Sequence, residues 1–153
     1  MMDYRKGGKE QIWIAGGIGV TPFLSWIRDM PQDLAHSIDF FYTVRTKDEA
    51  LFLSEIREAA QRHRHFRVYV IYSAERGRLT VEDIARTVPG NIAGKHIYMC
   101  GPSAMLASLT KDTCRAGGIN LHYQNISQPD YPSLMVEGGI GKRALGSRRV
   151  AYA

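Results

Sequence analysis

The feature of this sequence that most constrains its fold is a regular alternation between apolar strand-like runs and longer helical patterns. Five runs rich in β-branched and aromatic residues are typical of buried strands, and they cover residues 11–15, 37–44, 66–72, 95–100 and 119–123. Segments with apolar side chains at helical spacing lie between them, at residues 22–30, 49–62, 80–88 and 102–116. Such alternation favours parallel strands with right-handed helical crossovers. The sequence therefore predicts a three-layer α/β sandwich.

Capping signals mark the ends of the expected helices. Thr80 is a suitable N-cap for the third helix, and Thr46 and Glu49 have capping-box spacing at the start of the second. Gly117 and Gly118 are suited to end the last helix. Ligands of parallel sheets bind beyond the carboxyl ends of the strands, so we expect functional residues in the loops that follow each strand.

Length and composition fit one globular domain. The 153 residues suffice for one core, and the hydrophobic share of 44% and charged share of 23% are ordinary. No apolar run reaches the roughly 18 residues of a membrane-spanning helix, and the first residues lack the apolar stretch of a secretory signal. Cys100 and Cys114 form neither a disulfide framework nor a metal-ligand cluster, so we expect no metal site and a reducing, cytoplasmic setting.

The formal net charge of +5 raises the question of nucleic-acid binding. Four basic and two acidic residues give residues 127–153 a net +2, and the remaining +3 is spread over several segments of residues 1–126. This distribution is typical of a solvated surface, in which a few arginines can meet the phosphates of a small ligand. We therefore expect no nucleic-acid partner.

Residues 127–153 depart from the alternating pattern. They hold two prolines and four glycines, and they lack a periodic apolar run. We therefore interpret residues 1–126 as one domain and residues 127–153 as an irregular C-terminal extension, disordered or foreign to the natural fold.

The strongest functional signal is a glycine-rich corner at residues 15–22, Ala-Gly-Gly-Ile-Gly-Val-Thr-Pro, which follows a strand and opens a helix. Glycines let backbone amides approach a phosphate, and a helix N-terminus presents free N–H groups to an anion. Thr21 is the expected cap of this helix, and Pro22 suits its first position. The segment is neither GxGxxG nor a P-loop, so a plain strand-to-helix turn is the alternative.

A second corner, Met99-Cys100-Gly101-Pro102, also joins a strand to a helix. Gly101 permits close approach of a ligand, and Pro102 is suited to start the helix. For Cys100 the alternative is a buried structural thiol, because no histidine or aspartate stands beside it to make it a nucleophile.

Arginines and hydroxyl groups gather after the second and third strands. These residues are Thr43, Arg45, Ser73, Arg76 and Arg78. An arginine in such a loop can bind phosphate oxygens bidentately, although a solvated arginine is the alternative for each. The carboxylate of Glu75 would instead hold ribose hydroxyls and repel a 2′-phosphate.

Taken together, the two corners, Gly16–Pro22 and Cys100–Pro102, resemble those of the NAD(P)-binding domain of the ferredoxin–NADP reductase superfamily. The segments at residues 40–45, 49–52 and 77–80 are more similar to its ferric-reductase-like branch. The resemblance covers roughly residues 10–123 and implies a five-stranded parallel sheet in the order 3-2-1-4-5.

The resemblance also implies roles for these residues. The side of the site that holds the pyrophosphate and nicotinamide would be lined by Gly16, Gly17, Gly19, Val20, Thr21 and Pro22. The loop that selects a 2′-phosphate would hold Ser73 with Arg76 or Arg78, and the segment near the nicotinamide would hold Cys100, Gly101, Pro102 and Met105. Among these, Cys100 would serve the reaction by tuning the nicotinamide pocket.

The function implied by the resemblance is hydride transfer from NADPH or NADH to a flavin, followed by one-electron transfer to an iron, haem or iron–sulfur acceptor. FAD or FMN would be held by a separate β-barrel domain, N-terminal to this one, which the few residues before Gln11 are too short to form. By itself the chain should bind nucleotide but catalyse little. Arg45, Arg76 and Arg78 favour NADP(H), and in this branch the full-length protein can be membrane-associated.

One departure from the family and one alternative function remain. Family members commonly carry acidic residues and a flavin-covering aromatic after the last strand, whereas here Gln124 and Asn125 follow Tyr123. The alternative is a nucleotide-sensing or interaction module without redox activity.

Overall fold

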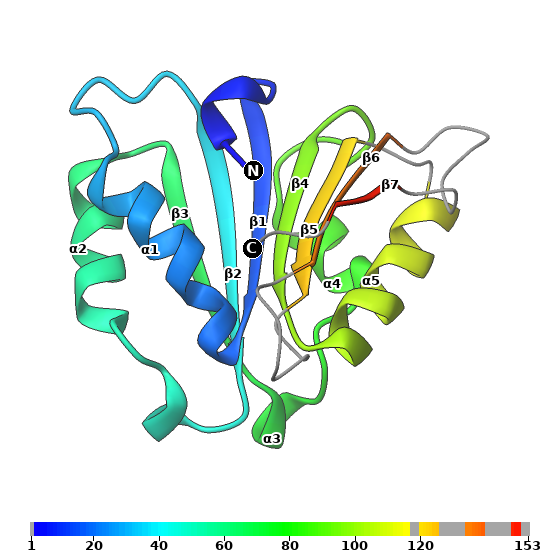
Figure 1. Cartoon of the computed structure of the whole chain (residues 1–153). Coiled ribbons are helices and arrows are strands. Elements are labelled where there is room, and N and C mark those ends of the chain that lie inside the picture. Colours follow the sequence, from blue (N-terminus) through cyan, green and yellow to red (C-terminus); the bar gives the residue numbers. More distant parts are fainter. Residues whose placement is uncertain (1, 117–119, 126–133, 140–147, 151–153) are drawn as a thin grey trace.

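The strands form one sheet in the order β3-β2-β1-β4-β5-β6-β7 in the computed structural model of the chain (Figure 1). The structure describes residues 2–116, 120–125, 134–139 and 148–150. Strands β1 to β5 are mutually parallel, which confirms the predicted order 3-2-1-4-5. Their bounds are Glu10–Gly16, Ser37–Val44, Phe66–Tyr72, His96–Gly101 and Asn120–Asn125.

Helices cover both faces of this sheet. The α-helices are α1 (Val20–Arg28), α2 (Leu53–Arg62), α3 (Ser73–Arg76), α4 (Val81–Thr87) and α5 (Ser103–Arg115), and three short 3₁₀ turns cover Tyr4–Lys6, Gly17–Gly19 and Lys47–Glu49. Helices α1 and α2 lie on one face, and α4 and α5 lie on the other (Figure 1). The three-layer α/β sandwich is therefore confirmed. Within the described residues, every helix is too short or too polar to cross a bilayer.

The core consists of two layers because successive strand side chains point to opposite faces. On β1, Trp13 packs into the layer under α1 and α2 with Phe23 and Phe40, whereas Ile12 and Ile14 pack into the layer under α4 and α5. The central strand is thus buried on both faces, as its unbroken apolar sequence predicts.

The expected irregular extension contains regular structure. Strand β6 (Leu134–Gly139) pairs antiparallel with β5, and β7 (Arg148–Val150) pairs antiparallel with β6. The sequence lacked the periodic apolar signal for these strands, and backbone pairing along the edge of β5 is what defines them. The rest of residues 127–153, and the Gly117–Gly118 helix end, lie outside the described residues.

Two helix starts differ from those expected. Helix α1 begins at Val20 with Gly19 as its N-cap, so Thr21 and Pro22 lie inside the first turn. Helix α2 begins at Leu53 rather than Glu49, because Phe52 adopts a left-handed conformation with φ 59° and interrupts the helical pattern. The predicted N-cap at Thr80 is confirmed, and Asp83 completes a capping box with it.

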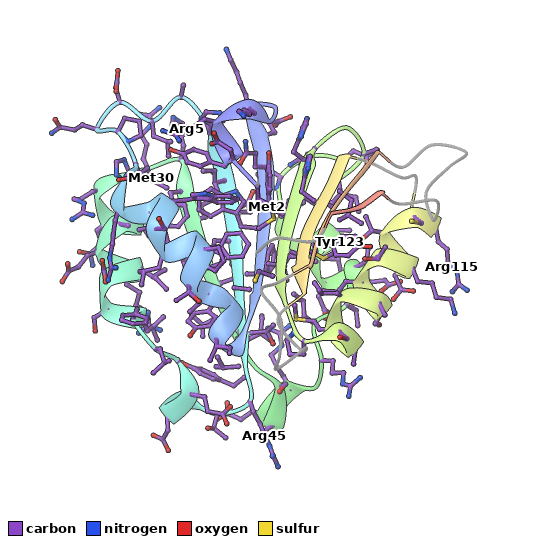
Figure 2. All side chains as sticks on the ribbon, in the orientation of Figure 1. Met2, Arg5, Met30, Arg45, Arg115 and Tyr123 are labelled. Carbon is purple, nitrogen blue, oxygen red and sulfur yellow. The ribbon has the colours of Figure 1, made fainter. Side chains whose placement is uncertain are left out.

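The N-terminal residues pack at the amino edge of the sheet, opposite the functional loops. Gln11 is buried, donates to the carbonyl of Tyr4 (2.6 Å) and accepts from the indole nitrogen of Trp13 (2.9 Å). Figure 2 shows Met2 and Arg5 toward this end and Arg45 at the other. The amino edge is therefore closed by core packing, which leaves the carboxyl edge for ligands.

Candidate functional site

A partly open cavity of about 320 Å³ lies at the carboxyl edge of the parallel strands. It extends from the ends of β2 and β3, past the end of β1, to the start of α5. Its lining residues are Gly16, Gly17, Thr43, Val44, Arg45, Glu49, Ser73, Arg78, Leu79, Pro102, Ala104, Met105, Ser108 and Leu109. The cavity thus lies where a parallel α/β sheet binds its ligand.

The two glycine corners lie side by side at the centre of this edge. Ala15 and Cys100 are register partners on the neighbouring strands β1 and β4. A Cβ at Gly19 would lie 2.2 Å from the carbonyl oxygen of Cys100, so the backbones touch there and exclude a side chain. Gly17 has φ +55°, a conformation that glycine adopts without strain. The turn therefore requires glycine at both positions, and it leaves the backbone beside the cavity bare.

Methionine forms the wall where the two corners meet. A Cβ at Gly16 would lie 2.7 Å from the sulfur of Met105, and one at Gly101 would lie 2.4 Å from its terminal methyl group. Met105, Ser108 and Leu109 share one face of α5 and all line the cavity. This end of the cavity is predominantly apolar.

The opposite end of the cavity is charged. Arg45 and Arg78 line it together with Glu49 and Ser73. The carboxylate of Glu49 accepts a hydrogen bond from the backbone N–H of Arg45 (3.1 Å), and the carbonyl of Arg45 accepts one from the N–H of Ala74 (3.1 Å). These bonds hold the loops after β2 and β3 together. An anion bound at this end would meet two guanidinium groups.

Some predicted residues lie outside the lining of this cavity. Arg76 lines a second cavity of about 280 Å³ with Tyr69 and Asp83, beside β3 and α4. Thr21 donates its hydroxyl to the carbonyl of Ile18 (2.6 Å), and so closes the glycine turn instead of capping α1. Gly19, Val20, Pro22 and Gly101 shape the two corners without lining the cavity wall.

Cys100 is fully buried in the core layer under α1 and α2. Burial raises the pKa of its thiol from 9.0 to about 12, because the thiolate would lose its hydration. The thiol is therefore protonated at neutral pH, which is the state of a structural cysteine. Its role beside a nicotinamide stays a prediction.

The sequence missed several cavity residues. Leu79, Ala104, Ser108 and Leu109 line the cavity, and so does Glu49, for which the sequence predicts no ligand contact. Ser108 and Leu109 follow Met105 by three and four residues, so helical periodicity carried a usable signal for them. Glu75, the predicted ribose ligand, does not line the cavity. No cluster of metal-ligating side chains occurs among the described residues.

A parallel sheet with a bare glycine corner, and with arginines at one end of an adjoining cavity, defines a nucleotide-binding α/β domain. The chain belongs to the family described as "Oxidoreductase NAD-binding domain", which matches residues 13–111. The resemblance to the NAD(P)-binding domain of the ferredoxin–NADP reductase superfamily is confirmed by this match and by the reductases named below. Placement in the ferric-reductase-like branch stays a prediction.

Similar proteins include a monooxygenase reductase subunit and an O-demethylase oxidoreductase. The chain is 32% identical over 109 residues to the carnitine monooxygenase reductase subunit of Acinetobacter pittii, covering 70% of this chain and 32% of that one. It is 34% identical over 103 residues to the vanillate O-demethylase oxidoreductase of Pseudomonas putida, covering 66% and 30%. The chain thus spans about a third of the length of these curated relatives.

A solved structure shares the fold. The flavohemoglobin of Malassezia yamatoensis with bound FAD and heme superposes with a TM-score of 0.61 at 21% identity, over 72% of this chain and 29% of that one. At this identity the likeness concerns the fold alone.

Proposed function

We propose that this chain is the NAD(P)H-binding half of a flavin-dependent oxidoreductase, which passes electrons onward to an iron, haem or iron–sulfur acceptor. The observation that carries the proposal is the cavity that joins a charged end, Arg45 and Arg78, to an apolar end at Met105, past the bare backbone of Gly16 and Gly17. This order of chemistry fits the adenosine, diphosphate and nicotinamide parts of a dinucleotide.

Each part of the cavity would have a distinct task. Gly16 and Gly17 would let the diphosphate approach the backbone, and Arg78 would bind the adenosine end. Pro102 and Met105 would provide an apolar wall at the other end, where Cys100 lies behind the surface. When bound, the nicotinamide supplies the hydride, and the protein supplies placement and exclusion of water.

A further domain of the full-length protein would hold FAD or FMN. The relatives named above are reductases about three times as long as the matched region. The exposed large apolar side chains of the described residues are Ile18, Leu51 and Phe52, and all three follow β1 or β2 on the cavity side of the sheet. Exposed apolar residues on one edge support a docking partner there.

The remaining assignments belong to the same proposal. Residues 1–126 would form the NAD(P)-binding domain. The protein would act in the cytoplasm. If the full-length protein is associated with a membrane, this domain would lie on the cytoplasmic face. Binding of a dinucleotide at the cavity would explain the positions of Arg45 and Arg78, so no nucleic-acid partner is needed to explain them. A nucleotide-sensing module without redox activity is the competing function.

Nucleotide titration tests the proposal. The chain should bind NADPH or NADH in calorimetry, and failure to bind either at millimolar concentration would contradict it. The chain should then be joined to its native upstream region and assayed for flavin absorbance and NAD(P)H oxidation. Binding without flavin or oxidation would favour the sensing module.

A further inference from the structure

One acidic side chain stands among the described residues that line the cavity, and it is Glu49. It belongs to the turn between β2 and α2, at the charged end of the cavity beside Arg45, Ser73 and Arg78. The other charged side chains at this end are arginines, which attract anions. A carboxylate among them changes which form of the adenosine group binds there.

Backbone hydrogen bonds hold this carboxylate in position. Oxygen Oε2 of Glu49 accepts from the backbone N–H of Arg45 at 3.1 Å. The backbone carbonyl of Arg45 in turn accepts a hydrogen bond from the N–H of Ala74, the neighbour of Ser73, at 3.1 Å. The carboxylate is therefore placed between the ends of β2 and β3. The bond to Arg45 uses Oε2, and the second carboxylate oxygen, Oε1, has acceptor capacity for a ligand.

We propose that Glu49 is the residue that selects against a 2′-phosphate on the adenosine ribose, an inference that rests on the proposed function. An ionised carboxylate only accepts hydrogen bonds, so it pairs with a ribose hydroxyl and repels a phosphate dianion. Arg45 and Arg78, on the same cavity, have the opposite preference. The balance between the carboxylate of Glu49 and these two guanidinium groups sets the ratio of NADH to NADPH affinity.

Glu49 takes the role that the sequence suggested for Glu75. Both carboxylates follow strands that end at this edge, but Glu49 lines the cavity and Glu75 does not. The sequence therefore indicated that a glutamate after one of these strands meets the ribose. The turn between β2 and α2 places Glu49, and not Glu75, at the cavity.

The test is the substitution Glu49→Gln in the 153-residue chain, with Asp48→Asn as its matched control. Glutamine keeps an oxygen that can accept from the N–H of Arg45, so the turn is preserved. Asp48→Asn makes the same change of charge one residue away, at an exposed position that does not line the cavity. Calorimetry would measure binding of NADH, NADPH, AMP and 2′-phospho-AMP to each protein.

For Glu49→Gln we expect the ratio of NADPH to NADH affinity to rise about tenfold, equal to about 1.4 kcal/mol. The same shift should occur between 2′-phospho-AMP and AMP, because it arises at the adenosine end. Asp48→Asn should change either ratio less than about twofold, as a screened surface charge does.

Three outcomes separate this inference from the proposed function. Equal shifts in both variants would show a long-range charge effect and overturn the inference. Unchanged ratios in Glu49→Gln, with both nucleotides still bound, would overturn the inference and leave the proposed function standing. Failure of the unsubstituted chain to bind any of the four ligands would overturn both.

Discussion

Arg76 and Arg78 show how much two residues of separation matter in the loop after β3. In the sequence they are equivalent candidates for a phosphate contact. In the structure Arg76 ends α3 and lines the second cavity, whereas Arg78 lines the main one. Gly77 lies between them with φ +83°, a conformation that glycine adopts without strain, and it ends α3 before Arg78.

Arg78→Ala should therefore weaken NADPH binding, and Arg76→Ala should serve as its control. A charge-assisted hydrogen bond contributes about 1.5–3 kcal/mol, and exposure of this side chain places the expected effect near the lower end, at about tenfold in Kd. NADH binding should change less, because its ribose lacks the 2′-phosphate. Calorimetric titration would check this, and a larger effect from Arg76→Ala would contradict the placement of the two side chains.

The buried thiol of Cys100 makes a second prediction at the residue scale. Both cysteines are free, and Cys114 is only half-buried, so an alkylating reagent at pH 8 should modify Cys114 first and Cys100 only on unfolding. Peptide mass spectrometry would check the order. Rapid native labelling of Cys100 would show that the thiol is open to solvent.

The raised pKa of Cys100 also sets the sign of a pH effect. The folded-state pKa of about 12 lies above the ordinary 9.0, so the unfolded thiol loses its proton first as the pH rises. The contribution to stability is full below pH 9 and is lost as the pH rises toward 12. Cys100→Ala should lose this part of the alkaline decline in unfolding free energy, which denaturant titrations from pH 8 to 11 would show.

At the scale of elements, the sequence predicted most strands and missed the turns. The predicted bounds of strands 37–44 and 66–72 match the structure at every residue. Long runs of apolar and β-branched residues are typical of strands that are buried on both faces of a sheet. The start of α2 was wrong because Phe52 adopts a left-handed conformation that its side chain disfavours. Contacts distant in sequence hold it there, including the guanidinium of Arg28 at 5.8 Å from its ring.

The site was predictable to the same extent. The glycine corners follow from local sequence, because the turn at Gly17 and the close approach at Gly19 each require glycine. The direction of an arginine, or the presence of Glu49 in the cavity, depends on how separate loops meet. That information is tertiary, so a single sequence reveals the residue types at the edge but not which of them face the ligand.

Thr80 and Thr46 provide a matched test of the two predicted caps. Thr80 accepts from the backbone N–H of Asp83 (3.1 Å), and Asp83 accepts from that of Thr80 (3.1 Å), so Thr80→Ala should lower the unfolding free energy by about 1 kcal/mol. Thr46 makes no side-chain cap bond, so Thr46→Ala should cost little. Urea denaturation of both variants would check this, and equal losses would contradict the difference between the caps.

At the scale of the whole molecule, the cavity and the extra strands lie on different parts of the sheet. All described residues that line the cavity fall between Gly16 and Leu109. They lie at the ends of β1 and β2, in the segments that follow β1, β2, β3 and β4, and on the first two turns of α5. Strands β6 and β7 instead continue the sheet beyond β5. Among the described residues, the ligand edge therefore belongs to the parallel part of the sheet, whereas β6 and β7 extend the sheet's far edge.

Removing residues 127–153 should leave nucleotide affinity unchanged within about twofold while it lowers stability. Strand β5 would become an edge strand, and its unpaired backbone groups would promote self-association. The packing of Leu121 against α5 should survive, because that face of β5 does not depend on β6. For residues 1–126, thermal unfolding followed by circular dichroism would check stability, light scattering would check self-association, and NADPH titration would check nucleotide affinity. Loss of binding in a folded monomeric truncation would show that the extension contributes to the site, and the domain boundary proposed here would then move to include it.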